Sequence, residues 1–182
     1  MHRLEIGLPG RLRHRASACA DAETGNPLES ARADYRPEAP GGQLQSALSD
    51  LARRYDLIAI YSFGSRAGEV AARVAGKTVE VTHPGSDVDI GVLPAPGRRL
   101  TAAERADLTV ALEDLLGVSR VDMVVLPEAP PFLALDIVRG ELLCTTDPVA
   151  EAEYQLYVLR RAADLAPFER QRRQMILAGE AY

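Results

Sequence analysis

The sequence lacks the marks of several protein classes. It has no basic excess, because 21 Lys and Arg residues stand against 26 Asp and Glu residues, for a formal net charge of −5. Binding to nucleic-acid phosphates needs clustered Lys and Arg, so general nucleic-acid binding is not expected. No apolar run approaches the roughly 18 residues of a membrane span, and the N-terminal region has no apolar segment typical of a secretory signal. We therefore expect a cytoplasmic protein without membrane contact.

Cysteine is equally scarce. The chain has two cysteines, Cys19 and Cys144, whose separation excludes a disulfide framework and fits no metal-ligand spacing. Cys144 ends the apolar stretch 141–144, where cysteine behaves as a small buried hydrophobe. We predict that Cys144 is a core residue.

The length of 182 residues favours one domain with a tail, at about 150 residues per domain. Residues 17–40 mix small, charged and proline residues without a period, and cannot bury enough apolar surface to offset their ordering entropy. We predict that residues 1–42 form a disordered or loosely docked tail and that residues 43–182 form the folded domain. A misassigned start codon is the alternative explanation for the tail.

Beyond residue 42, apolar periodicity predicts alternating helices and strands. We expect helices at 44–54, 67–74, 101–117, 132–139 and 148–175, and strands at 57–63, 79–82, 87–93, 121–126 and 141–144. Thr101 and Glu104 form a capping box, and Asp147 with Pro148 supplies an N-cap and a proline at the first helical position. Strands interleaved with helices indicate an α/β or α+β fold.

Two carboxylates lie on one predicted strand. Asp87 and Asp89 point to the same face, with Cα atoms about 6.6 Å apart, while Val88, Ile90 and Val92 point to the core. At about 6 Å the two charges repel by roughly 3 kcal/mol at an effective dielectric of 20. Either water on an exposed face or a bound cation must offset that repulsion.

A third carboxylate, Asp122, lies on the strand 121–126 among apolar neighbours. If this strand lies beside the strand 87–93, the three carboxylates converge on one patch. Carboxylate oxygens suit Mg²⁺, particularly where substrate phosphates complete the coordination shell. Two such ions about 3.5–4 Å apart can clamp the attacking and leaving oxygens of an in-line displacement.

Gly64 and Ser65 fit the same chemistry. A strand that ends in glycine and leads into a helix presents backbone N–H groups to an anion. Gly64 lets the backbone approach a phosphate closely, and the Ser65 hydroxyl can donate to a phosphate oxygen. Alone, this pair is typical of a turn, and an Asp-x-Asp pair is typical of a solvated strand face. The three features in this order favour a phosphate-transfer site.

The segments 63–66, 86–92 and 121–125 together resemble the polymerase-beta superfamily of nucleotidyltransferases, most closely its small single-domain branch, the minimal nucleotidyltransferases. The stretch 132–143 is similar to that branch's short helix, glycine and strand. The resemblance covers about residue 43 to the C-terminus. It implies an α+β fold, with a small mixed β-sheet flanked by helices, and Mg²⁺-dependent transfer of a nucleoside monophosphate from an NTP.

The resemblance also implies roles for particular residues. The family's first two carboxylates bind both metal ions, and the third binds one and accepts the acceptor's proton. Carried over, these are Asp87, Asp89 and Asp122, with two Mg²⁺ ions. Gly64 and Ser65 match the family's triphosphate-binding pair. Arg66 and Ser86, their neighbours in the motifs, are further candidates for nucleotide binding.

One segment departs from the family pattern. The stretch between Ser65 and Asp87 is longer than usual, which leaves the phosphate contact of Arg66 open. Lys77 and His83 have no inherited role, and we expect a solvated lysine and a turn residue. Arg139, before a glycine, is expected at the surface.

The leading hypothesis is a nucleotidyltransferase that transfers AMP from ATP to a hydroxyl of a partner protein. Minimal nucleotidyltransferases of this kind often act as antitoxins that modify a HEPN-type ribonuclease, and this resemblance supplies the expected partner. The chain is short for a separate substrate domain, so we expect another macromolecule to present the acceptor. Two alternatives stay open: transfer to a small molecule such as an aminoglycoside, and a non-catalytic module that neutralises a partner by docking.

Overall fold

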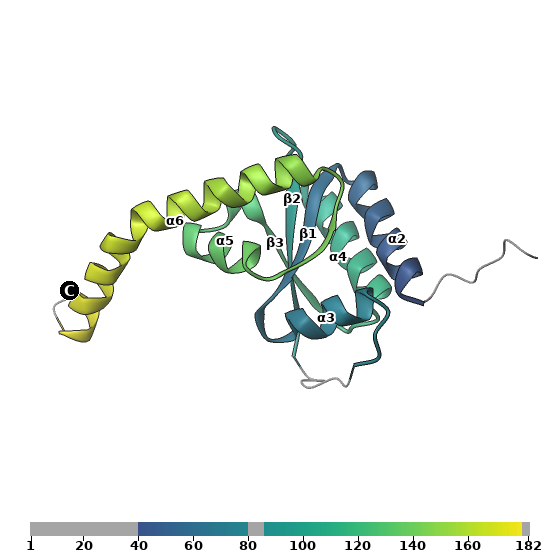
Figure 1. Ribbon diagram of the computed structural model, residues 1–182, viewed down its shortest axis with the longest axis horizontal. Coiled ribbons are helices and arrows are strands. Elements are labelled where there is room, and N and C mark those ends of the chain that lie inside the picture. Colours follow the sequence, from purple (N-terminus) through teal and green to yellow (C-terminus); the bar gives the residue numbers. More distant parts are fainter. Residues whose placement is uncertain (1–39, 80–85, 180–182) are drawn as a thin grey trace, which may run out of the picture. The chain divides into compact units, whose positions relative to one another are not determined.

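The computed structural model describes residues 40–79 and 86–179, which form a four-stranded sheet with helices on both faces (Figure 1). The α+β class expected from the sequence is confirmed. The strands are β1 (Leu57–Phe63), β2 (Val88–Pro94), β3 (Val121–Val125) and β4 (Glu141–Thr145). The helices are α2 (Pro40–Arg54), α3 (Ala67–Val74), α4 (Ala102–Leu116), α5 (Pro131–Val138) and α6 (Pro148–Leu177), with 3-10 turns η1 (Gly64–Arg66) and η2 (Leu126–Glu128).

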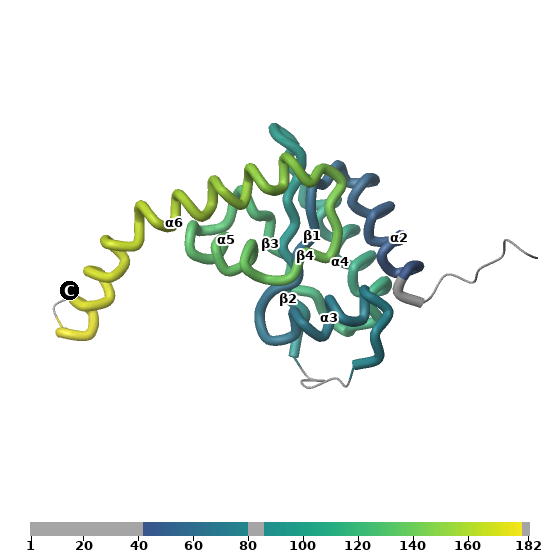
Figure 2. Tube along the Cα trace, viewed as in Figure 1, coloured from purple at the N-terminus to yellow at the C-terminus, as the bar shows by residue number. Residues whose placement is uncertain are grey.

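The sheet is mixed, with the strand order β3-β2-β1-β4, and all four strands are labelled in Figure 2. Strand β1 runs antiparallel to β2 and β4, whereas β2 and β3 run parallel. The end of β1 therefore meets the beginnings of β2 and β3 at one edge of the sheet. The adjacency of β2 and β3 satisfies the condition under which the three carboxylates share a patch.

Each face of the sheet has its own apolar core, because side chains alternate between the faces along a strand. Helices α2, α3 and α4 pack against one face, where Val88, Ile90 and Val92 have no exposed surface. The inward orientation predicted for these three residues is confirmed. Helix α5 and the first turns of α6 cover the other face, where Tyr61 and Ile137 are fully buried (Figure 1).

The predicted helix starts are present. The Thr101 hydroxyl accepts from the Glu104 backbone N–H at 3.2 Å, and the Glu104 carboxylate accepts from the Thr101 backbone N–H at 2.8 Å. Pro148 begins α6, and the Asp147 carboxylate accepts from the backbone N–H groups of Val149 and Ala150 at 3.1 and 3.0 Å. Both caps satisfy donors that have no partner inside a helix.

A buried polar link joins α6 to the sheet. The Tyr61 hydroxyl of β1 donates to the Glu151 carboxylate of α6, and the Gln155 side-chain amide donates to the same oxygen at 2.5 Å. Burial and the neighbouring carboxylate raise the pKa of Tyr61, so its hydroxyl stays protonated.

None of the described helices has both the length and the apolar character of a membrane span.

Some predicted boundaries shift. Strand β2 begins at Val88 rather than Asp87, the strand at 121 ends at Val125 before η2, and α2 begins at Pro40. Val79 lies in no strand, which corrects the prediction there, and residues 80–82 of the same prediction lie outside the described residues.

Cys144 is buried as predicted, and burial raises its pKa to about 11. Residues 1–39, which hold Cys19 and most of the predicted tail, also lie outside the described residues.

Candidate active site

The register of the parallel pair places two of the predicted carboxylates side by side. Asp89 of β2 is the neighbour of Asp122 on β3, and Asp87 lies two residues before Asp89, one residue before the strand begins. Residues two apart on an extended chain share a face, so the side chains of Asp87 and Asp89 lie on the same side. Asp122 is exposed, and the other two carboxylates are partly exposed. The three predicted carboxylates therefore gather at one edge of the sheet.

The glycine of the predicted phosphate loop lies against this carboxylate edge. Gly64 follows β1 with a φ of +73°, a conformation that side-chain-bearing residues rarely adopt. A Cβ atom there would lie 2.4 Å from Oδ2 of Asp89. Phe63, the residue before Gly64, pairs with Asp89 across the two strands. Only glycine therefore lets the turn with the exposed Ser65 approach the carboxylates so closely.

The pKa of Asp89 is raised above its ordinary value. Partial burial is the largest cause, followed by the negative charges of Asp122 and Asp87. Each effect disfavours the ionised form. The pKa shift therefore reflects burial first and the neighbouring negative charges second, and a cation among the carboxylates would oppose the second effect.

Arg120, which is not among the residues predicted from the sequence, supplies part of the missing positive charge. Its Nε lies 3.4 Å from Oδ2 of Asp87, and its Nη2 lies 3.1 Å from Oδ1 of Asp122. Arg120 lies two residues before Asp122 at the start of β3, a spacing that places both side chains on one face. This two-residue spacing is the sequence signal by which Arg120 could have been predicted. The Arg120 guanidinium therefore helps to offset the repulsion between the carboxylates, which was expected from water or a bound cation alone.

The two remaining nucleotide-binding candidates meet each other. Arg66 is buried, its Nε and Nη2 donate to the Glu69 carboxylate at 3.1 and 2.8 Å, and its Nη1 donates to the Ser86 carbonyl at 2.8 Å. Ser86 is exposed directly before Asp87. The Arg66 guanidinium therefore points into the protein in this structure.

The residues without an inherited role lie as expected where they are described. Lys77 and Arg139 are exposed, and His83 lies outside the described residues. Within 40–79 and 86–179, no three His, Cys, Asp or Glu side chains are already arranged as a metal-ligand cluster. The carboxylates share an edge, but the Arg120 guanidinium lies between two of them.

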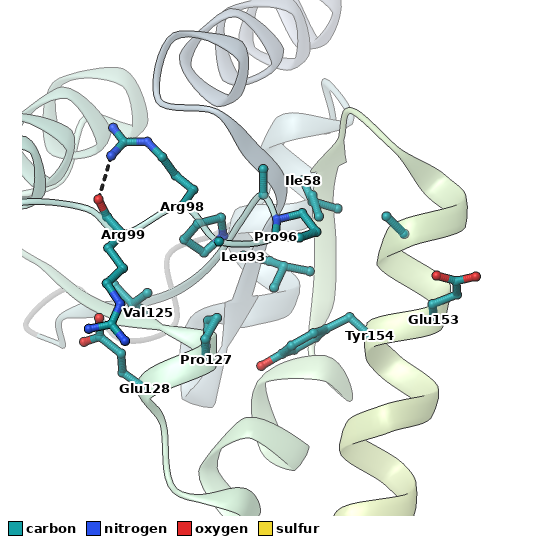
Figure 3. A pocket seen from close by; sticks show the side chains of 14 residues that line it. Ile58, Leu93, Pro96, Arg98, Arg99, Val125, Pro127, Glu128, Glu153 and Tyr154 are labelled. Carbon is teal, nitrogen blue, oxygen red and sulfur yellow. Dashed lines mark hydrogen bonds between the residues drawn. The ribbon is translucent and has the colours of Figure 1, made fainter.

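A separate cavity of about 620 Å³ opens at the other end of β2 (Figure 3). Its walls are largely apolar and come from β1, β2, η2 and α6. Figure 3 shows the Tyr154 ring between α6 and Pro127, with Arg98 and Arg99 on the opposite side. None of the predicted site residues lines this cavity.

The family model described as polymerase beta, nucleotidyltransferase matches residues 46–149. This range contains all of the predicted site residues. The chain therefore belongs to the polymerase beta nucleotidyltransferase family, as its motifs indicated.

The chain is similar in fold to solved toxin–antitoxin structures. A toxin–antitoxin with AMP-PNP matches at 24% identity and a TM-score of 0.54, covering 75% of this chain and 98% of the other. The toxin–antitoxin MntA–HepT matches at 22% identity and a TM-score of 0.52, covering 77% and 99%. A tri-AMPylated Shewanella oneidensis HEPN toxin in complex with MNT antitoxin matches at 22% identity and a TM-score of 0.51, covering 78% and 99%. A comparison with curated proteins finds no match.

Proposed function

We propose that the chain is a Mg²⁺-dependent adenylyltransferase that transfers AMP from ATP to a hydroxyl of a HEPN-type partner protein and thereby acts as its antitoxin. The observation that carries the proposal is the single edge at which Asp89, Asp122 and the Gly64 turn meet in a nucleotidyltransferase domain. The adenylyl group and the partner follow from the named complexes of similar fold, one with AMP-PNP and one with a tri-AMPylated HEPN toxin.

The residues of this edge fit a divalent cation. Asp87, Asp89 and Asp122 offer hard oxygen ligands, and substrate phosphates would complete the shell. Arg120 already lies between two of these carboxylates, which is evidence that they attract positive charge. When bound, the metal ions supply positive charge at the attacking and leaving oxygens.

Residues of the chain itself are assigned to phosphate binding, proton acceptance and metal binding. The backbone around Gly64 and the Ser65 hydroxyl hold the triphosphate close to Asp89, because no side chain intervenes at residue 64. Asp122 would hold the proton that the acceptor hydroxyl loses as its oxygen bonds the α-phosphorus of ATP and pyrophosphate leaves. Asp87 and Asp89, directly before and within β2, would hold the metal ions.

The test combines the purified chain, a HEPN-type protein from the same genome, Mg²⁺ and ATP labelled in the α-phosphate. We expect label on the partner, and a fall of at least about 100-fold in the Asp87→Asn/Asp89→Asn double variant. Charge stabilisation by the metal ions is worth several kcal/mol, at about 1.4 kcal/mol per tenfold in rate. Wild-type chain that never transfers label to the partner contradicts the proposal.

The same variant separates the alternatives. A double variant that no longer transfers label but still neutralises the partner supports the docking module instead. Transfer to an aminoglycoside, with none to the partner, supports the small-molecule enzyme. Circular dichroism and thermal unfolding of the variant serve as the control, because an unfolded variant would lose every activity.

A further inference from the structure

Arg66 makes three hydrogen bonds to two separate parts of the chain. Two of its N–H groups donate to the two oxygens of Glu69, in the first turn of α3. A third N–H donates to the backbone carbonyl of Ser86, 20 residues further along the chain. Both Arg66 and Glu69 are buried, at 6% and 8% exposed.

Arg66 and its partner Ser86 belong to the two halves of the candidate site. Arg66 is the last residue of η1, the turn that contains Gly64 and Ser65. Ser86 stands directly before Asp87, at the beginning of the segment that carries the first two carboxylates. One guanidinium therefore ties the phosphate turn to the carboxylate strand.

The geometry suits a rigid brace better than a phosphate contact. A guanidinium is planar, and its bidentate contact with the Glu69 carboxylate fixes its plane and leaves the Nη1 edge facing Ser86. The Glu69 charge balances that of Arg66 within a buried site. To reach a triphosphate, Arg66 would have to give up two charge-assisted hydrogen bonds to the buried Glu69 carboxylate, near which Nη1 of Arg73 also lies, 3.9 Å from Oε1.

We propose that Arg66 is a positioning residue that holds the Gly64–Ser65 turn and the Asp87–Asp89 strand in the fixed relation that a metal-bound nucleotide requires. This inference rests on the proposed function, because it assigns phosphates to the turn and a metal ion to the carboxylates. A brace of this kind does not create either half-site. It sets how strongly ligand binding at one half favours ligand binding at the other.

The experiment measures the coupling directly. Calorimetry gives the affinity of the full chain for Mn²⁺ alone, for AMP-PNP alone, and for Mn²⁺ in the presence of AMP-PNP. In the wild-type chain we expect AMP-PNP to raise the Mn²⁺ affinity. In Arg66→Lys we expect that gain to fall about tenfold, with each separate affinity changed less than about threefold, because an ammonium group cannot reproduce the fork geometry.

Arg105→Lys is the matched control. Arg105 also donates to both oxygens of a carboxylate, Glu128, at 2.8 and 2.5 Å, and to the Leu100 carbonyl at 3.1 Å. These contacts lie by the cavity, away from the carboxylate edge. We expect wild-type coupling in this variant.

Glu69→Gln separates a brace from a phosphate ligand by the sign of its effect. If Arg66 braces the site, loss of the Glu69 charge loosens it, and the coupling falls as in Arg66→Lys. If Arg66 binds phosphate, the same change releases it, and the affinity for AMP-PNP rises. A rise therefore overturns the proposal, as does an Arg66→Lys variant that weakens AMP-PNP binding alone as much as it weakens the coupling.

Stability provides the remaining readout. If Arg66 has a purely structural role, a variant that remains folded should have a lower unfolding midpoint but wild-type coupling. That result also overturns the proposal. If the wild-type chain itself shows no gain in Mn²⁺ affinity with AMP-PNP, the proposed function fails together with the brace. Wild-type coupling that survives in both variants refutes the brace alone.

Discussion

The two ends of β2 differ sharply, although one face of the strand runs through both. Asp89, Gly91 and Leu93 lie on that face, since they are two residues apart. At the Asp89 end the strand meets two other carboxylates and a glycine turn. At the Leu93 end it forms the wall of an apolar cavity (Figure 3). Between them, Gly91 leaves room for Ile137 of α5, whose Cγ2 atom would lie 2.2 Å from a Cβ there.

The difference lies in how each end balances charge. Around the cavity, acidic and basic side chains form close pairs: Arg98 with Glu104 at 2.5 Å and Arg105 with Glu128 at 2.5 Å. At the other end one exposed arginine, Arg120, is shared by two carboxylates, and Asp89 remains among like charges. An arginine shared by two carboxylates therefore marks the end of the strand that we propose to be reactive, whereas the cavity marks the other end.

The largest expected effect comes from filling the space at the acidic end. In Gly64→Ala the new methyl group would lie 2.4 Å from an Asp89 oxygen, on a backbone of φ +73° that costs a side-chain-bearing residue about 1–2 kcal/mol. We expect a loss of at least about tenfold in Mg²⁺-ATP affinity by calorimetry. Gly68→Ala is the control, because its Cβ would meet nothing within 4 Å. Equal losses in both variants would show that the Gly64 turn has no special role.

The next effect tests, through stability, how α6 is attached to the sheet. Helix α6 forms one wall of the cavity and is joined to β1 by the Tyr61–Glu151 hydrogen bond. Tyr61→Phe removes one donor from a buried carboxylate, which costs about 1–3 kcal/mol of unfolding free energy. Urea denaturation measures the loss of unfolding free energy. Tyr154→Phe, the same substitution in the cavity wall, is the control, and we expect a smaller loss there. Mg²⁺-ATP affinity should not change, and a tenfold loss of it would contradict the independence of the two ends.

A smaller effect concerns the Arg120 guanidinium, the positive charge that already lies at the acidic end. Arg120→Gln removes a positive charge beside Asp87 and Asp122, so Mn²⁺ should bind more tightly. An exposed ion pair is worth about 0.2–1 kcal/mol, or up to about fivefold in affinity. Arg99→Gln at the cavity rim is the control, with no expected change. The gain should shrink as salt screens the exposed charges, and a weaker Mn²⁺ affinity in Arg120→Gln would refute this role.

The sequence predicted most of the fold because its signals are local. The capping box at Thr101, the N-cap at Asp147 and the alternation of Val88, Ile90 and Val92 depend on spacing within one element. Approximate helix and strand positions followed from these patterns. Boundaries shifted by a few residues, because the end of an element depends on neighbours that periodicity does not identify.

The sequence predicts the residues of the candidate site but not the contacts between them. The carboxylates and the glycine turn stand out by residue type, and strand pairing brings them together. The roles of Arg120 and Arg66 depend on partners from other segments, Asp87 and Ser86 respectively. Spacing alone could place Arg120 beside Asp122. Nothing local marks Arg66 as buried, because that requires knowing where α3 packs.

The smallest predicted effect is a difference in the sign of pH dependence between the two ends. The pKa of Asp89 is raised above its ordinary value of 3.8, first by burial and then by Asp122 and Asp87. The folded chain therefore binds this proton more tightly than the unfolded chain does. Its stabilising contribution is fully present below pH 3.8 and is lost as the pH rises through the raised pKa.

At the cavity end the sign is reversed. The Thr101 backbone N–H is the largest cause that lowers the pKa of Glu104 to about 2, and Arg98 adds to it. This group contributes stability above its ordinary pKa of 4.5, and that stability is lost as the pH falls toward 2. Unfolding measured from pH 2.5 to 7 should thus show opposite slopes when the wild-type chain is compared with Asp89→Asn and with Glu104→Gln. As the pH rises, the stability of wild type relative to Asp89→Asn should fall, whereas its stability relative to Glu104→Gln should rise. Slopes of the same sign would mean that burial and the neighbouring carboxylates do not raise the pKa of Asp89, and the contrast between the two ends of β2 would fail.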